Sequence, residues 1–313
     1  MWPLSAGILA LLSATCALAL PTTPLLEERA TSTNYTSIVV FGDSLVDNGN
    51  GTYLLSNKTW PSDRAYFDGR FSNGETWPEQ LANLLHVPHV HDFAYGGATT
   101  NNSAAQGYSD YNSTLPVPDV IHQVGQYLDL VNGTADPSGI YIVSGGSNDV
   151  FFGTAKTLDL FGLAETAVRT LEAEARRLIR HGAKTIVFPT LSDMTKTPAA
   201  LHYSNLIDIV GSTLFVDHFN KVLRSAAHDV SRDATVYIFD LHEAVGRIKS
   251  HKKRYGLDNV SDACLQGTTK PEVEKGVKRH VCNNPDAYFF WDIYHPTAQA
   301  HKLLGDAALP LFS

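Results

Sequence analysis

Short runs of apolar, β-branched residues recur along the chain, and each ends in glycine or small polar residues. Continuous apolar runs of this length are typical of strands that are buried on both faces of a parallel sheet. The pattern predicts five such strands, at residues 38–41, 87–93, 140–143, 184–189 and 235–240.

Between these runs the apolar positions follow helical spacing. In residues 117–131, for example, they recur every three or four positions, and Asn132-Gly133 is a typical helix end. Helices are predicted over residues 76–86, 117–131, 158–180, 204–230 and 297–309. Strands that alternate with helices imply right-handed crossovers and one parallel sheet. We therefore predict an α/β fold, a three-layer α/β/α sandwich around a flavodoxin-like five-stranded parallel sheet.

The N-terminus has the pattern of an export signal. Residues 1–20 carry no charged side chain, and residues 17–19 have the small-x-small form of a signal-peptidase site. We predict a signal peptide over residues 1–19, a mobile lead-in over residues 20–36 and a single domain over residues 37–313. No other long apolar run occurs, so the sequence predicts a secreted, extracellular protein without a transmembrane helix.

Cysteine and asparagine patterns agree with export. Removal of Cys16 with the signal leaves Cys264 and Cys282, which allow one pairing, and we predict that they form a disulfide. No Cys or His lies at metal-ligand spacing around them, so we predict no metal there. Sequons for N-glycosylation begin at Asn34, Asn50, Asn57, Asn101, Asn112, Asn132 and Asn259.

Composition narrows the classes of partner. Of the 313 residues 43% are hydrophobic, which is enough for a sizeable core. The formal net charge of −8 argues against nucleic acid or an anionic membrane surface as a partner, because both require a basic surface. We expect a monomer that acts on a small molecule.

Polar residues with catalytic potential follow three of the predicted strands. Ser44, Gly97 and Asn148 come after strand ends, and Asp292 and His295 share a loop before the last helix. Because the carboxyl ends of parallel strands meet at one sheet edge, we expect these residues to lie together. The histidine can take the serine proton through Nε2 while the aspartate holds Nδ1. Backbone N–H groups and the asparagine amide can stabilise an oxyanion. The sequence thus predicts nucleophilic acyl transfer without cofactor.

Two other interpretations use the same residue types. Asp292 and His295 could ligate a metal, but a hydrolytic metal site needs about three protein ligands. Asp240 and His242 also follow a predicted strand and form a rival acid/base pair. We favour the Asp292 pair.

Four short motifs carry a resemblance to a known family. They are Gly42-Asp43-Ser44-Leu45, Gly97 within residues 93–98, residues 146–149 and Asp292-x-x-His295. These motifs resemble blocks I, II, III and V of the GDSL, or SGNH, hydrolases, in family order over residues 38–296.

The resemblance implies a role for each motif. Ser44 is the implied nucleophile and first oxyanion donor, and Gly97 and Asn148 are the other donors. His295 is the implied base and Asp292 its orienting acid. Five residues before Gly97 this chain has Asp92, where the family pattern has asparagine. We expect this difference to alter the hydrogen bonds that support the loop, but not the backbone donor itself.

Longer stretches narrow the resemblance. Residues 49–53, 60–61, 69–74 and 92–102 are similar to fungal secreted esterases of carbohydrate esterase family 16. That similarity implies an acetylesterase that releases acetate from acetylated xylo-oligosaccharides. Plant-type GDSL lipases share several of these stretches, so a lipase or lysophospholipase acting on longer acyl chains is the alternative. A non-catalytic carbohydrate-binding protein on the same fold is the alternative from another class. As substrate-binding residues we predict Asp43, Trp60, Tyr95 and Trp291, and we expect Trp291 to line the site beside Asp292.

Overall fold

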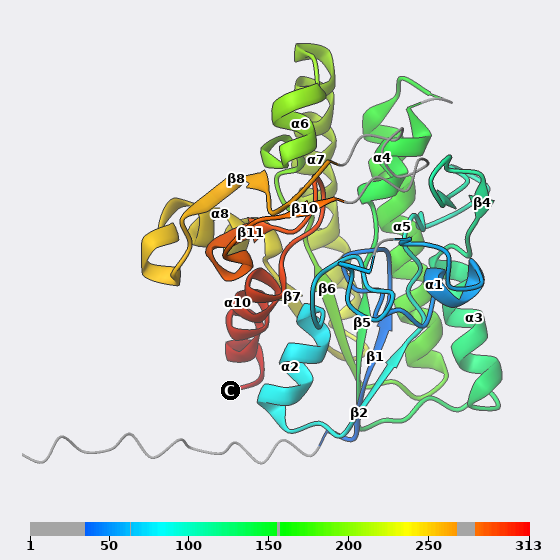
Figure 1. Cartoon of the computed structure of the whole chain (residues 1–313). Coiled ribbons are helices and arrows are strands. Elements are labelled where there is room, and N and C mark those ends of the chain that lie inside the picture. The colour runs from blue at the N-terminus through cyan, green and yellow to red at the C-terminus, as the bar shows by residue number, and fades with distance from the viewer. Residues whose placement is uncertain (1–34, 63, 155–156, 268–278) are drawn as a thin grey trace, which may run out of the picture. The chain divides into compact units, whose positions relative to one another are not determined.

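A computed structural model describes residues 35–62, 64–154, 157–267 and 279–313. They are built around a five-stranded parallel sheet of order β2-β1-β5-β6-β7 (Figure 1). The strands are β1 (Ser37–Phe41), β2 (His89–Asp92), β5 (Gly139–Val143), β6 (Thr185–Pro189) and β7 (Thr235–Phe239). The predicted fold class and strand order are confirmed. The predicted signal peptide, most of the lead-in and the sequon at Asn34 lie outside the described residues.

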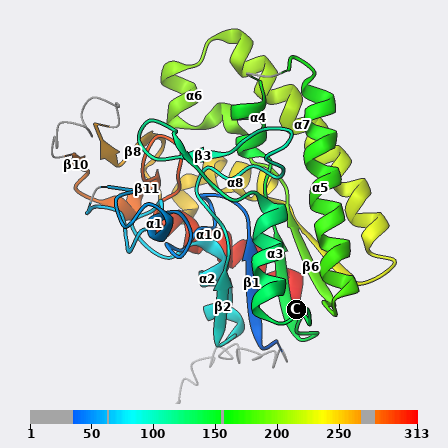
Figure 2. The ribbon, with the colours of Figure 1, turned by 90° about the vertical axis from the view of Figure 1, so that its right-hand side faces the viewer.

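Side chains on the two faces of the sheet pack into two separate hydrophobic cores. Ile38 and Val40 of β1 face one core, whereas Val39 and Phe41 face the other, as expected for a side-chain period of two. The first core is covered by α2 (Trp77–Leu85), α8 (Leu241–Ser250) and α10 (Ala298–Ala308). The second is covered by α3 (Val120–Leu130), α5 (Leu160–Arg180) and α7 (Leu206–Val230), so helices cover both faces of the sheet (Figures 1 and 2).

All five predicted helices are present, with ends within about three residues of the expected ones, and polar side chains cap them. Asp119 caps α3, and Thr76 and Glu79 form a capping box at α2. Helix α8 was not predicted. The other short elements are α1 (Thr52–Leu55), α4 (Ser147–Gly153), α6 (Pro198–Tyr203), β3 (Tyr108–Ser109), β4 (Leu115–Pro116), η1 (Met194–Lys196), η2 (Lys252–Tyr255), η3 (Pro285–Ala287) and η4 (Leu309–Phe312).

A disulfide-closed hairpin lies against the segment that leads to Asp292. It consists of β9 (Leu265–Gln266) and β10 (His280–Val281), which pair antiparallel, and the Cys264–Cys282 disulfide closes it as predicted. The N–H of Leu265 donates to the carbonyl of Trp291 at 2.7 Å. Next to the hairpin, β8 (Asn259–Ala263) pairs in parallel with β11 (Tyr288–Phe290). The hairpin is therefore joined by backbone hydrogen bonds to the loop that carries Asp292.

Removal of this disulfide should lower stability without changing the sheet. The cysteines are 18 residues apart, and closing a loop of that size contributes about 3 kcal/mol in the chain-entropy account. We expect the Cys264→Ser/Cys282→Ser variant to lose about 3 kcal/mol of unfolding free energy, measured by urea denaturation. Reduced wild type should match the variant. Equal midpoints for the oxidised wild type and the variant would show that the disulfide contributes nothing.

Two surface features bear on the export predictions. In the part of the chain that the structure describes, no helix combines the length and apolarity needed to cross a membrane. Among the described sequons, the asparagines at 50, 57, 112 and 132 are exposed, and those at 101 and 259 are half-buried. Glycosylation of these sites stays a prediction.

Candidate active site

Ser44 and His295 meet at the carboxyl edge of the sheet, although they lie 251 residues apart in the sequence. Ser44 sits in the turn after β1, and its Oγ is 2.8 Å from Nε2 of His295. On the other side of the ring, Nδ1 is 2.8 Å from Oδ2 of Asp292 and 2.9 Å from Oδ1. The three predicted residues thus form a connected serine-histidine-aspartate array. Such an array can move the serine proton to the imidazole.

The carboxylate of Asp292 is buried yet well supplied with donors. The backbone N–H groups of Tyr294 and His295 each donate to Oδ1 at 2.8 Å, and the hydroxyl of Tyr66 donates to Oδ2 at 2.7 Å. Burial alone would raise the pKa of Asp292, but the charge of His295 and these hydrogen bonds outweigh it and hold the pKa below its ordinary value. Asp292 is therefore an anion at neutral pH, oriented to accept from Nδ1.

The residues predicted to stabilise an oxyanion lie around the same serine. Ser44, Gly97 and Asn148 all line one pocket. The amide Nδ2 of Asn148 donates to the carbonyl of Ala98 at 2.9 Å, which fixes the amide beside Gly97. Gly97 has φ +86°, and a Cβ there would collide with the carbonyl of Tyr108, so only glycine fits. Loops that follow different strands thus bring Ser44, Gly97 and Asn148 to one pocket.

Two buried residues that the sequence analysis did not single out hold these loops in place. The carboxylate of Asp47 accepts from the N–H groups of Thr52 at 3.0 Å and Gly96 at 2.9 Å, which joins the loop after β1 to the loop that carries Gly97. The amide of Gln123 on α3 brackets Gly42, accepting from its N–H at 2.8 Å and donating to its carbonyl at 2.9 Å. The Asp-Asn-Gly sequence after β1 indicates a loop held by side-chain hydrogen bonds, such as those of Asp47. No sequence pattern around Gln123 indicates its contact with Gly42.

Asp92 has a structural role that explains its departure from the family pattern. Its Oδ2 accepts from the N–H of Asn48 at 3.0 Å, and its Oδ1 accepts from the N–H of Ala94 at 2.8 Å. Both carboxylate oxygens of Asp92 act as acceptors, whereas an asparagine side chain has only one acceptor oxygen. Burial and the nearby charge of Asp47 raise the pKa of Asp92 well above its ordinary value. The aspartate therefore joins the first two loops directly.

The predicted substrate-binding residues divide into two groups. Asp43 and Trp60 line the pocket around Ser44. The prediction for Trp291 was wrong, because its side chain is buried against Cys264 and Leu265 in the hairpin cluster and does not line the pocket. Tyr95 does not line the pocket either, and its hydroxyl lies 3.4 Å from the Gln126 amide on α3.

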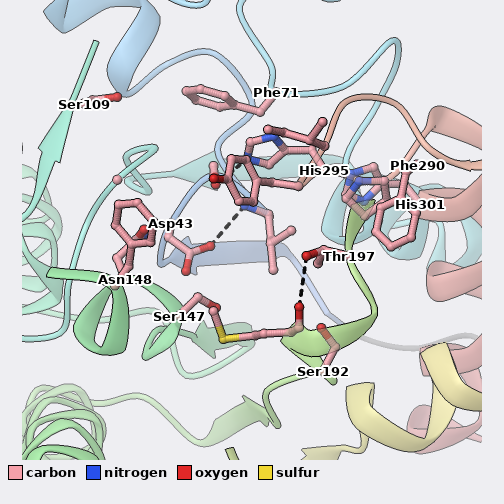
Figure 3. Close-up of a pocket in the computed structure, with 18 of the residues that line it drawn as sticks. Asp43, Phe71, Ser109, Ser147, Asn148, Ser192, Thr197, Phe290, His295 and His301 are labelled. Atoms are coloured by element: carbon pink, nitrogen blue, oxygen red, sulfur yellow. Dashed lines mark hydrogen bonds between the residues drawn. The ribbon is translucent and has the colours of Figure 1, made fainter. Parts of the chain in front are cut away.

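The pocket has a partly exposed mouth and a buried apolar interior. Its volume is about 400 Å³. The mouth is lined by Asp110, Tyr111, Ser147 and Asp193, with the buried Ser109 next to Asp110, and by the exposed side chains of Phe151 and Tyr294. The interior is lined by Trp77, Leu241, Phe289, Phe290 and Leu304, with the half-buried Val245. The interior side chains come from α2, α8, β11 and α10, and Figure 3 shows Phe290 and His301 on the same side of the pocket as His295.

Two basic residues line the apolar interior, and burial weakens the basicity of both. Burial lowers the pKa of His301 to about 3, and its Nδ1 accepts from the N–H of Trp77. Burial also lowers the pKa of Lys249 to about 8, while its Nζ donates to the carbonyl of Lys196 and lies 4.7 Å from the ring centre of Phe290. His301 is thus neutral at physiological pH, whereas Lys249 is still mostly protonated there and directs its charge to the carbonyl of Lys196.

The rival acid/base pair has a structural position. Asp240 caps α8 by accepting from the N–H of Glu243 and forms an ion pair with Arg224. Neither Asp240 nor His242 lines the pocket of Ser44. Among the described residues, no group of three or more His, Cys, Asp or Glu side chains is arranged to hold a metal ion.

A comparison with known protein families identifies the family of this chain. The profile of the family described as GDSL-like Lipase/Acylhydrolase matches residues 38–308. The chain belongs to this family. It is therefore an ester hydrolase of the GDSL type with the fold of that family. The narrower resemblance to carbohydrate esterase family 16 stays a prediction.

Relatives within the curated proteins are distant. The chain is 27% identical to thermolabile hemolysin of Vibrio parahaemolyticus over 87% of its own length and 62% of that protein. It is 25% identical to phosphatidylcholine-sterol acyltransferase of Aeromonas hydrophila, and the match covers 88% of this chain and 89% of that protein. Among solved structures, the acetylxylan esterase Axe2 of Geobacillus stearothermophilus has a TM-score of 0.48 at 13% identity, with 90% of this chain and 96% of that one covered.

Proposed function

We propose that this protein is a secreted serine esterase that hydrolyses carboxylic esters with short to medium acyl chains through an acyl-enzyme on Ser44. The observation that supports the catalytic part is the connected array of Ser44, His295 and Asp292 beside Gly97 and Asn148. Ser44 attacks the ester carbonyl while His295 takes its proton, and the leaving alcohol receives that proton. Water activated by the same histidine then releases the acid.

The apolar interior supports an acyl chain longer than acetyl. A pocket of about 400 Å³ is within the range that encloses a small-molecule ligand, whereas an acetyl group would leave most of it empty. Burial of each further methylene contributes about 0.8 kcal/mol, which is roughly a fourfold gain in kcat/KM while the chain still fits. We therefore place the acyl group in the interior beside Phe290 and Leu304.

The second candidate is the deacetylation of xylo-oligosaccharides, which the resemblance implies. The observation that favours it is the mouth of the pocket, where Ser109, Asp110 and Tyr111 offer hydroxyl and carboxylate partners for sugar hydroxyls. In that case the sugar would occupy the mouth and the acetyl group would enter only as far as Ser44.

A chain-length series separates the two candidates. We expect kcat/KM of p-nitrophenyl esters to rise from acetate through butyrate to octanoate and to fall for palmitate. The Val245→Trp variant, which fills the interior, should reduce activity on octanoate while leaving acetate nearly unchanged. Arg247→Trp, on the exposed side of the same helix, is the matched control. Preference for acetate, together with acetate release from acetylated xylo-oligosaccharides, would favour the second candidate.

A further inference from the structure

A line of polar contacts extends from Asp292 through Tyr66 to Arg279. The Tyr66 hydroxyl donates to Oδ2 of Asp292 at 2.7 Å, and Nη1 of Arg279 donates to the same hydroxyl oxygen at 3.0 Å. Tyr66 lies 226 residues from Asp292 and 213 from Arg279, so three separate segments meet here.

The direction of these hydrogen bonds is fixed by chemistry. A guanidinium has only donors, so the oxygen of Tyr66 must act as the acceptor from Arg279. The single phenolic hydrogen is then free to point only at Asp292. Burial and the charge of Asp292 raise the pKa of Tyr66 well above its ordinary value, so this hydrogen is retained at all physiological pH values.

The disulfide hairpin places Arg279 in this line. Arg279 directly precedes β10, which pairs with β9 and is held by the Cys264–Cys282 disulfide. Strand β9 in turn bonds to the backbone of Trp291, next to Asp292. Tyr66 packs in the same cluster, with its ring 6.4 Å from that of Trp291 in an edge-on arrangement. The hairpin and the loop of Asp292 are therefore one connected support.

We propose that Tyr66 and Arg279 are positioning residues of the esterase. They hold the Asp292 carboxylate in one orientation and partly compensate its negative charge, so that this charge favours the protonated form of His295 less strongly. This inference rests on the proposed function of the array. Tyr66 does not line the pocket of Ser44 and acts through Asp292, whereas Arg279 also lines that pocket, so the pH limb rather than KM is the readout of its positioning role.

The sign of the expected effect follows from the charges. When the hydroxyl of Tyr66 is removed, the negative charge of Asp292 is less compensated, so the protonated form of His295 is favoured. The fall of kcat/KM on the acid side of its pH profile, called here the acid limb, should then move to higher pH. The other titratable groups that face Asp292 or His295 are Tyr294, Asp43 and His301. These groups are unchanged in the variants, so a shift of the limb reports on Tyr66 and Arg279.

The test compares pH profiles of kcat/KM for Tyr66→Phe and Arg279→Met with wild type. We expect Tyr66→Phe to lose roughly tenfold in kcat/KM at its plateau and to shift the acid limb up by about one pH unit. Arg279→Met should shift it in the same direction, and Arg279→Lys should restore part of the shift. The double variant should resemble Tyr66→Phe alone. Tyr288→Phe, in the same cluster, is the control that should leave the limb in place.

A second measurement separates this inference from the proposed function. The rate at which a fluorophosphonate labels Ser44 depends on its activation by His295, and it needs no knowledge of the natural ester. A parallel upward shift of the acid limb of labelling in Tyr66→Phe supports the positioning role even if the tested esters are poor substrates. Unshifted limbs in both variants, with wild type active and labelled, would overturn the inference alone. A wild type that is neither active nor labelled would overturn both.

Discussion

Replacement of Ser44 by alanine should reduce ester hydrolysis by at least about 10⁴-fold, because no other group can form the acyl-enzyme. The hydroxyl of Ser44 is the group that lies 2.8 Å from Nε2 of His295. The variant keeps the oxyanion donors at Gly97 and Asn148, so a small residual rate over water should remain. The side chain is partly exposed in the pocket, and its truncation should leave the fold intact.

The measurement is kcat for the preferred p-nitrophenyl ester, together with mass spectrometry after fluorophosphonate treatment. Wild type should gain one label, on the peptide that contains Ser44, and Ser44→Ala should gain none. Ser144→Ala is the matched control, since Ser144 directly follows the neighbouring strand β5 and does not line the pocket. If Ser44→Ala hydrolysed esters at the wild-type rate, the nucleophile would have to be another residue.

The sheet could be predicted because its strands carry their signal locally. The strands β1 and β5 are buried on both faces, so each appears in the sequence as a continuous run of β-branched and aromatic residues. Helix α8 had a comparable signal, since Leu241, Ala244, Val245 and Ile248 recur at helical spacing. This signal is short and follows directly on strand β7, so it is easily taken for the polar end of the strand.

The array itself could be predicted for a topological reason. Ser44, Gly97 and Asn148 each follow a parallel strand, and the ends of parallel strands meet at one edge whatever the details of packing. The supports of the array could not be predicted in this way. Gln123 reaches Gly42 from a helix surface, and the contact of Tyr66 with Arg279 depends on how two irregular segments fold over the sheet. No local pattern marks such contacts.

Trp291 shows how neighbours in the sequence can mislead. It was predicted to line the site because it precedes Asp292. In the structure the backbone N–H of Trp291 donates to the carbonyl of His295 at 2.7 Å, while the indole ring packs on Cys264 and Leu265. Neighbouring residues in an extended segment point to opposite sides, so the residue beside a functional one commonly faces away from the site. Trp291 therefore supports the Asp292 loop from behind.

Replacement of Asp292 by asparagine should lower kcat by about 10⁴-fold at neutral pH, through the tautomer of His295. Oδ1 of Asp292 accepts two backbone N–H groups, so the single carbonyl oxygen of an asparagine would take that place. The amide nitrogen would then replace Oδ2 and face Nδ1 of His295. An amide nitrogen at this contact disfavours a hydrogen on Nδ1, and although the oxygen at the Oδ1 position also lies 2.9 Å from Nδ1, the tautomer with the hydrogen on Nε2 gains population. In that tautomer Nε2 cannot take the proton of Ser44.

The comparison that tests this argument is Asp292→Asn against Asp240→Asn, both measured as kcat on the same ester. Asp240 belongs to the rival pair and caps α8, and because asparagine caps a helix about as well as aspartate, its substitution should change stability little and leave kcat close to wild type. Fluorophosphonate labelling of Asp292→Asn should slow in parallel with kcat, because both reactions need the proton of Ser44 to move to Nε2. If Asp240→Asn lost activity and Asp292→Asn kept it, the assignment of the acid would be reversed. Asparagine is nearly isosteric with aspartate, so a loss confined to Asp292→Asn would arise from the hydrogen that Nδ1 can no longer donate.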